Sequence, residues 1–360
     1  MFDTLRSILT YVFVLGVLVF FHELGHYLAA RSRGVVVEVF SVGFGPALVS
    51  WRAKSGTLWK ISVLPLGGYV KMQGWGEPND PAPAVPGSFA GASLGSKAFI
   101  VAAGPLANLL LAFVLFSGLF MTVGRVVVQP VLSTIQPNSP AAAAGLLTGD
   151  RVMRIDGTNI RDFSQLQSIV SLHPDVEMDF TLLRQGKVID QEVALGDVSM
   201  DGEKIGHLGV VGTMSSIQHF SPPAAVAAAG RETWNDASGM LAGLYGLVVH
   251  RQGLGQLAGP LGIAQITGQV AAMGFISVIS FIAFLSINLG LVNLIPIPIL
   301  DGGHLLFYAA EVIYGRPVQP RALDIGLRFG AAVIISLFFI TTFNDLTRMG
   351  AVSWVMHLFG

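Results

Sequence analysis

Cysteine is absent from the chain, and charged residues are scarce. Without cysteine the protein can form neither disulfides nor thiolate metal sites, so histidine, aspartate and glutamate are the strong metal ligands that remain. Charged residues make up 12% of the 360 positions, against about 25% in soluble domains. The net charge of -1 gives no indication of a nucleic-acid partner. Since 52% of the residues are hydrophobic and the mean hydropathy is +0.65, the composition predicts an integral protein of a lipid bilayer.

Four stretches approach the roughly 20 apolar residues that a helix needs to cross a bilayer. Basic residues are concentrated between the first and second stretches, whereas only Arg6 precedes the first. The positive-inside rule therefore predicts that this loop is cytoplasmic and that both termini and the region 125–270 lie on the other side. The predicted spans are residues 5–30, 98–123, 275–300 and about 325–343.

The first apolar stretch contains the sequence His-Glu-Leu-Gly-His. On a helix, His22 and His26 lie one turn apart on one face, with Glu23 beside them, so two imidazoles can hold a metal ion while the carboxylate acts as a base. The pattern also occurs by chance in soluble helices. In a spanning helix, however, inert charged and polar residues would only cost free energy. The run is also too long for a signal peptide, and no small-residue cleavage site follows it.

The third apolar stretch ends in Asn288, Asn293 and two prolines, followed by Leu-Asp-Gly-Gly-His. Pro296 and Pro298 are predicted to bend this helix and to free backbone carbonyls. Asp301 is a candidate third metal ligand. Taken alone, it could equally cap a following helix, with the histidine after it a polar residue at the membrane border.

The predicted topology brings the two ends of the chain together. The first and third spans both run towards the cytoplasm, and Glu23 lies roughly 10 Å below that surface. Asp301 can reach the same depth. A catalytic zinc takes three protein ligands and an open fourth position, and His22, His26 and Asp301 supply that set.

The first loop and the second span contain further unusual segments. Gly43 to Pro46 is predicted to be a turn, and 59–72 a hairpin that turns at Pro-Leu-Gly-Gly. The hairpin is either an ordinary soluble one or an edge strand near the active site, where substrate could add as a strand. Residues 77–88 are predicted to be a proline-rich flexible linker. In the second span, Asn108 needs a hydrogen-bond partner, through helix packing or beside the metal helix.

The composition becomes that of a soluble domain over 126–212. A series of short strands and turns from Ala141 to Gly157, a helix at 163–172 and strands at 180–183 and 188–193 resemble a PDZ domain of the bacterial protease type. Such a domain binds extended peptides at a sheet edge, or else serves as a spacer or filter. The following region contains an apolar segment, 240–249, too short to span, which is predicted to be an amphipathic helix on the membrane surface.

Six motifs, in order, resemble the site-2 protease family of intramembrane zinc metalloproteases, closest to its bacterial regulators of the sigma-E response. The resemblance implies a polytopic α-helical membrane protein with about four transmembrane helices, a membrane-associated β-hairpin and an inserted extracytoplasmic PDZ domain. The expected divisions are 1–124, 125–215, 216–274 and 275–360. The motifs are H-E-L-G-H, G-F-G, P-L-G-G-Y-V-K-M, A-G-P-L-A-N, the PDZ region and N-L-I-P-I-P-I-L-D-G-G-H.

The resemblance also implies a function: cleavage of single-span membrane proteins, such as an anti-sigma factor, within the bacterial inner membrane after a first protease has cut them. It assigns Zn²⁺ to His22, His26 and Asp301, and the catalytic base to Glu23. Those bacterial relatives usually have two PDZ domains, and only one is visible here, so gating by a pair does not transfer. The residues expected to bind substrate are Gly43, Gly45, Gly67, Gly68, Asn293, Pro296 and Pro298.

Two other classes of function remain open at this point. A PDZ-bearing membrane scaffold would hold a structural or vestigial metal, but it would not need Glu23. A metal transporter would need a second row of intramembrane carboxylates, which the sequence does not offer. Loss of cleavage on replacing Glu23 would separate the enzyme from both.

Overall fold

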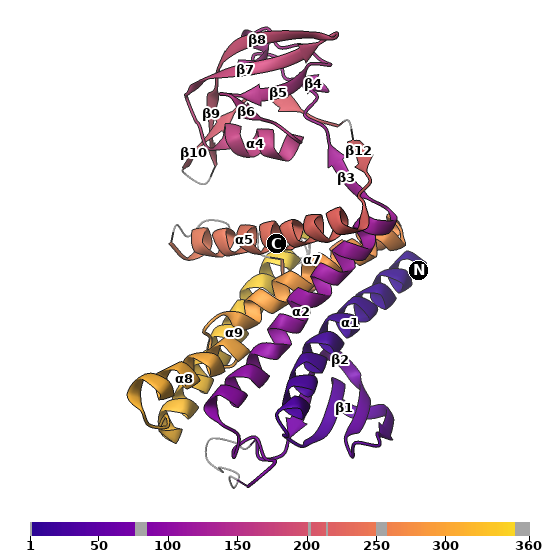
Figure 1. Ribbon diagram of the computed structural model, residues 1–360, viewed down its shortest axis with the longest axis vertical. Coiled ribbons are helices and arrows are strands. Elements are labelled where there is room, and N and C mark those ends of the chain that lie inside the picture. The colour runs from indigo at the N-terminus through magenta and orange to yellow at the C-terminus, as the bar shows by residue number, and fades with distance from the viewer. Residues whose placement is uncertain (1, 76–84, 201–202, 214, 250–257, 350–360) are drawn as a thin grey trace, which may run out of the picture. The chain divides into compact units, whose positions relative to one another are not determined.

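The structure, a computed structural model, divides into two compact units (Figure 1). Unit 1 comprises Met1–Gly118 and Val226–Gly360, and unit 2 comprises Leu119–Ala225. The structure describes residues 2–75, 85–200, 203–213, 215–249 and 258–349.

Unit 1 is built from long apolar helices, and all four predicted spans are helical. Within the described residues, four helices are long and apolar enough to cross a membrane. The second and fourth begin earlier than predicted, at Leu94 and Pro320. Most of the 77–88 linker lies outside the described residues. The helices are α1 (Phe2–Ser32), α2 (Leu94–Thr122), α5 (Pro222–Val249), α6 (Pro260–Ala272), α7 (Phe275–Leu294), α8 (Asp301–Tyr314) and α9 (Pro320–Arg348).

Small residues let α1, α2 and α7 approach closely, and Figure 1 shows the three running side by side. A Cβ at Gly25 of α1 would meet the carbonyl oxygen of Ala103 in α2. A Cβ at Gly290 of α7 would lie 2.9 Å from the Pro105 carbonyl oxygen. Glycine at these positions therefore permits the backbone contact that fixes α1 and α7 against α2.

The third span is shorter than predicted, and its prolines do not bend it. Helix α7 ends at Leu294, because a residue that precedes proline is pushed out of the α region. Ile295 accordingly has φ -62° and ψ 138°. Pro296 and Pro298 lie in the connection between α7 and α8, so the chain turns back at 295–300.

The loop after α1 folds into strands β1 (Val37–Arg52) and β2 (Leu58–Met72), and both bend back on themselves. Residues 39–42 pair on one side with 68–71 and on the other with 58–61. The Pro-Leu-Gly-Gly segment is therefore not a hairpin turn, since β1 lies between the two halves of β2. The G-F-G-P segment is likewise a bend inside β1. Positive φ angles make both bends possible without ending the strand.

This arrangement leaves residues 68–72 at one edge of the sheet. They pair with β1 on one side, and no other strand among the described residues pairs with them. Of the two predicted alternatives, an isolated soluble hairpin and an edge strand close to the HExxH helix, the structure therefore has the edge strand. It packs against α1.

The apolar segment 240–249 is the end of a longer helix, α5, which starts at Pro222. Helix α5 is not among the four described helices that are apolar enough to cross a membrane. Helix α6 follows, and its first turn is capped by Asp345 of α9. The Asp345 carboxylate accepts hydrogen bonds from the backbone N–H groups of Gly259 and Gly262, at 3.0 and 2.8 Å.

Unit 2 has a buried apolar core between α4 and a four-stranded sheet of order β6-β5-β7-β8. Asp162 caps α4 by accepting a hydrogen bond from the Gln165 N–H. The helix and strands predicted over 163–172, 180–183 and 188–193 are present. The elements are β3 (Arg125–Val128), β4 (Thr134–Ile135), α3 (Pro140–Ala143), β5 (Arg151–Ile155), β6 (Thr158–Asn159), α4 (Phe163–Ser171), β7 (Glu177–Arg184), β8 (Lys187–Ala194), β9 (Gly196–Met200), β10 (Glu203–His207), β11 (Val210–Val211) and β12 (Ser215–Gln218).

An ion pair with a buried carboxylate stabilises this sheet. Arg184 donates two hydrogen bonds to Asp150, at 2.8 and 2.7 Å, and Leu147 N–H donates a third. Burial by itself would raise the pKa of Asp150, but these hydrogen bonds outweigh it and hold the pKa below its usual range. The carboxylate is thus ionised at neutral pH and fully paired.

Replacing Asp150 by Asn should loosen unit 2. Removing one partner of a buried pair costs about 3–5 kcal/mol, and we expect roughly 2 kcal/mol here because Arg184 is partly exposed. Amides of β5 and β7 should then exchange hydrogen about 30-fold faster in the full chain. Asp190→Asn is the matched control, since within the described part of the chain that carboxylate accepts an exposed hydrogen bond from Thr181. Equal protection in the two variants would contradict the role of the pair.

Candidate metal centre and active site

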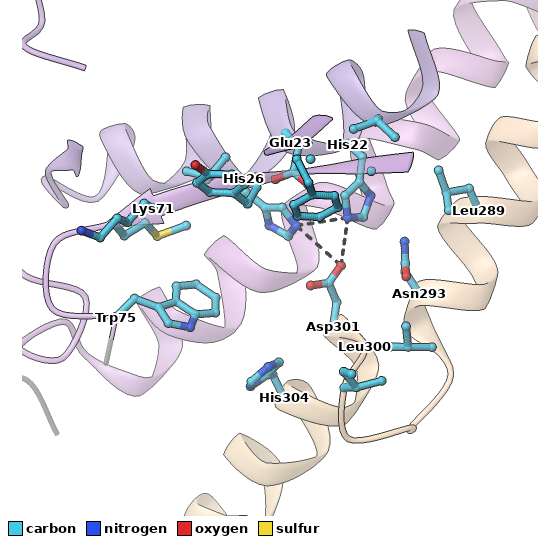
Figure 2. Close-up of a pocket in the computed structure, with 18 of the residues that line it drawn as sticks. His22, Glu23, His26, Lys71, Trp75, Leu289, Asn293, Leu300, Asp301 and His304 are labelled. Carbon is cyan, nitrogen blue, oxygen red and sulfur yellow. Dashed lines mark hydrogen bonds and ion pairs between the residues drawn. The ribbon is translucent and has the colours of Figure 1, made fainter. Parts of the chain in front are cut away.

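Helix α1 presents His22, Glu23 and His26 within unit 1, where Figure 2 shows them at one cavity. Glu23 and His26 are buried, with exposed fractions of 8% and 7%. A continuous apolar run forms this helix, so its few polar groups are presented from a rigid element. The i, i+4 spacing places both imidazoles on the same face.

Asp301 approaches from the other end of the chain as the first residue of α8. The glycines after it make this possible. A Cβ at Gly302 would meet the carbonyl oxygens of Leu294 and Ile295, and a Cβ at Gly303 would meet that of Ile297. The Asp-Gly-Gly sequence therefore lets the start of α8 fold back on the end of α7, with its carboxylate directed at α1 (Figure 2).

Three ligand atoms converge at this point. His22 Nε2 and His26 Nε2 are 3.3 Å apart, and Asp301 Oδ2 lies 3.2 and 3.5 Å from them. A tetrahedral zinc ion with bonds of about 2.0–2.1 Å keeps its ligand atoms roughly 3.3–3.4 Å apart. The triangle has these dimensions. Among the described residues, these three form a group whose ligand atoms lie within 4.8 Å of one another.

The surroundings of the Asp301 carboxylate also favour a bound cation. Asp301 Oδ2 is buried and has no hydrogen-bond partner among the described residues. A buried carboxylate oxygen in this position costs free energy unless a positive charge lies beside it. The two imidazoles and the carboxylate therefore suit a divalent ion that accepts nitrogen and oxygen ligands, and Zn²⁺ is one such ion.

Helix α2 orients the second imidazole. His26 Nδ1 donates a buried hydrogen bond to the carbonyl oxygen of Ile100, at 2.9 Å. Its Nε2 is then the unprotonated nitrogen with a lone pair for a metal. Gly104 of α2 lies directly against the His26 ring, and a Cβ there would meet Nε2 itself. Glycine at 104 is thus required for the ring to occupy this position.

The three candidate metal ligands line a cavity of about 970 Å³ in unit 1. Of the residues expected to bind substrate, Gly67, Gly68 and Asn293 line it. Gly43, Gly45, Pro296 and Pro298 do not; they lie in the bends that shape β1 and the α7–α8 connection. The edge segment 68–72 lines the cavity along its whole length, beside the ligands.

Glycine at 68 brings the edge segment close to helix α1. A Cβ there would lie 2.9 Å from Cγ of Glu23 and 2.7 Å from Cγ1 of Val19. At Gly67, where φ is 142°, a Cβ would lie 2.7 Å from the Phe44 ring. Any side chain at 68 would therefore displace Glu23 or the strand.

Sequence reasoning missed several residues of this site. Trp75 and His304 line the cavity, with their rings edge-on at 5.9 Å. Burial lowers the pKa of His304, so its imidazole is neutral at pH 7 and can donate one N–H. Nothing in the local sequence signals Trp75. Ile100 and Gly104 also belong to the surroundings of His26, and their part in the site depends on which face of α2 meets α1.

Known proteins match the whole chain. The sequence profile of Peptidase family M50 matches residues 10–337. A Rhizobium meliloti protein named "Putative zinc metalloprotease R01501" is 40% identical, with 94% of this chain and 96% of that protein covered. "Metalloprotease MmpA" of Caulobacter vibrioides is 32% identical, with 100% of both covered. Among solved structures, the PDZ domain of a SdrC-like protein from Listeria monocytogenes matches 23% of this chain and 85% of its own, with 15% identity and a TM-score of 0.21.

The profile match and the full-length relatives cover the metal-ligand helix, the edge segment and Asp301 alike. The chain therefore belongs to peptidase family M50, the site-2 proteases, and is a membrane-spanning zinc metalloprotease.

Proposed function

We propose that this protease hydrolyses peptide bonds within the transmembrane segments of single-span membrane proteins. The observation that carries the proposal is the position of the ligand triangle, since His22 and His26 belong to a helix that is apolar over the length of a bilayer. Its substrates would be membrane proteins already shortened by a first protease, and anti-sigma factors belong to that class.

The residues divide the chemistry between them. His22, His26 and Asp301 would hold zinc, which would lower the pKa of a bound water and polarise the scissile carbonyl. Glu23 removes a proton from the attacking water and later delivers it to the leaving amine nitrogen. Its burial beside the ligands places the carboxylate in the same cavity that receives the substrate.

The edge segment 68–72 would hold the substrate. A helical segment hides its carbonyl groups in its own hydrogen bonds and must unwind before it can be cut. In a membrane, the freed backbone groups need new partners. An unpaired strand edge beside Glu23 supplies them by strand addition, and Asn293 faces the same cavity from the end of α7 (Figure 2).

The charges of the loops support one orientation of the chain in the membrane. Basic residues between α1 and α2 favour the cytoplasmic side of the bacterial inner membrane for the edge segment and the metal centre. Unit 2 then lies in the periplasm. Its strand series supports a PDZ domain that binds an extended peptide or excludes large outer domains, so that shortened substrates enter.

The test is cleavage by the full chain in phospholipid vesicles. The substrate is a single-span protein with a short outer tail, and products are located by mass spectrometry. We expect about one zinc per chain, a cut inside the apolar segment and no cut after treatment with a zinc chelator. If the protein binds zinc but cuts no substrate in a panel of such proteins, the result would favour the alternative function of a membrane scaffold. Cuts confined to soluble loops would overturn the intramembrane assignment.

Replacing Gly67 by Val should slow cleavage about 10-fold or more with zinc content unchanged, because the added atoms meet Phe44 and displace the edge segment. Gly56→Val is the matched control. Gly56 also has a positive φ, 88°, but its Cβ would meet nothing within 4 Å. Equal rates for both variants and the wild type would remove the edge segment from substrate binding.

A further inference from the structure

Asn108 of α2 is fully buried and lies against the first metal-ligand histidine. Its Nδ2 is 3.2 Å from His22 Nδ1. Its other amide atom, Oδ1, is buried without a hydrogen-bond partner among the described residues. In an apolar helix, an unpaired buried carbonyl oxygen is costly, so this amide requires an explanation.

The two ends of an asparagine amide have nearly the same shape, so which one faces a neighbour is decided by hydrogen bonding. With Nδ2 facing the ring, the amide would donate to Nδ1, and the proton of the neutral imidazole would be on Nε2. That proton would point at Asp301 Oδ2, 3.2 Å away, and would leave no lone pair for a metal. Oδ1 would remain unpaired.

The opposite orientation removes the conflict at the ring. With Oδ1 facing His22, Nδ1–H donates to that oxygen and Nε2 keeps its lone pair, while Nδ2 takes the buried position that Oδ1 held. We propose that Asn108 is a positioning residue that holds His22 in the tautomer able to bind zinc. The inference rests on the proposed zinc site and concerns a residue outside the ligand set.

The register of α2 supports this assignment. Ile100, Gly104 and Asn108 are spaced by four, so they form one stripe along the helix. The Ile100 carbonyl accepts the Nδ1–H of His26, Gly104 makes room for that ring, and Asn108 meets His22. Each ligand histidine of α1 thus faces its own oxygen acceptor on α2.

Helix α7 also contacts Asn108 and holds it in place. Ser286 Oγ donates a buried hydrogen bond to the Asn108 carbonyl oxygen, at 2.8 Å. Gly290, one turn further on, lets the two backbones approach, since a Cβ there would lie 3.4 Å from the Cβ of Asn108. The amide is therefore held by packing as well as by the imidazole.

The experiment measures the zinc dissociation constant of the full chain in detergent, by competition with a chromophoric chelator. Asn108→Leu keeps the size but removes the acceptor, and the loss of such a partner typically weakens metal binding 10–100-fold. Asn108→Asp keeps an oxygen acceptor and loses the amide donor, so we expect affinity close to that of the wild type. Asn288→Leu is the matched control, because among the described residues that amide donates to the Phe284 carbonyl oxygen of its own helix.

Rescue by aspartate is the readout that a purely structural role of the amide would not give. Wild-type affinity in Asn108→Leu would overturn the proposal, as would a loss in Asn108→Asp equal to that in Asn108→Leu. If Asn108→Leu does not fold, Asn108→Ala takes its place as the variant without an acceptor, and the comparison with Asn108→Asp is unchanged. Failure of the zinc site itself is distinguishable, because the wild type would then bind no zinc or His22→Ala would bind it unchanged.

Discussion

Replacing Glu23 by Gln should lower the cleavage rate by about 10²- to 10⁴-fold while zinc remains bound. Glutamine has the same size and keeps an oxygen in the cavity, but its amide cannot take the proton of the attacking water. Zinc should be retained because Glu23 is not in the ligand group, which among the described residues is His22, His26 and Asp301. Zinc content and single-turnover cleavage in vesicles, measured on the same preparation, check the two halves of this expectation.

The matched control for that variant is Glu177→Gln, the same change at an exposed position of β7. It should cleave at the wild-type rate. If Glu23→Gln cleaved as fast as this control, Glu23 would not be the base, and the metal site could belong to a scaffold. If it lost zinc as well, Glu23 would instead take part in metal binding.

The sequence alone predicts the membrane helices and the convergence of His22, His26 and Asp301. Membrane helices follow from local composition, since a run of about 20 apolar residues has few alternatives in a bilayer. The spacing of His22 and His26 is also a local feature, because both residues lie on one predicted helix. Asp301 could be added because the alternating direction of the spans puts both segments at one side of the membrane. The 3.2 Å approach of Asp301 to His22 then depends on Gly302 and Gly303, whose close packing the sequence does not reveal.

The strands between α1 and α2 were not predictable in the same way. A Pro-Leu-Gly-Gly segment between two alternating runs predicts a hairpin, because the nearest partner in sequence is the usual one. Here residues 39–42 lie between the two halves of β2. That pairing is chosen by packing against α1 and by glycines with positive φ in both bends, and neither is a local signal.

The partners of the ligands were also hidden from the sequence. Prolines mark where a helix is interrupted, but only the structure shows that α7 ends at Leu294 and that the prolines belong to the connection. The Ile100 acceptor is a backbone carbonyl, so its side chain carries no signal. Gly104 could be suspected only after the face of α2 that meets α1 was known.

Replacing Asp301 by Ala should weaken zinc binding by more than about 100-fold, since hydrogen-bond partners behind a ligand are alone worth 10–100-fold. The substitution removes an oxygen that lies 3.2 and 3.5 Å from the two ligand nitrogens. It leaves two imidazoles, and a catalytic zinc site uses three protein ligands. We expect zinc to fall from about one per chain to far below that after dialysis, and cleavage to be lost with it.

Asp324→Ala is the matched control, since that carboxylate pairs with Arg328 one turn away on α9 and does not belong to the ligand group. It should bind zinc as the wild type does. Zinc bound equally well by Asp301→Ala would mean that His22 and His26 find another third ligand, and the two ends of the chain would then be joined by packing alone. Loss in Asp301→Ala together with retention in Glu23→Gln would instead separate the residue that holds the metal from the residue that moves the proton, which is the division of labour that a metalloprotease requires.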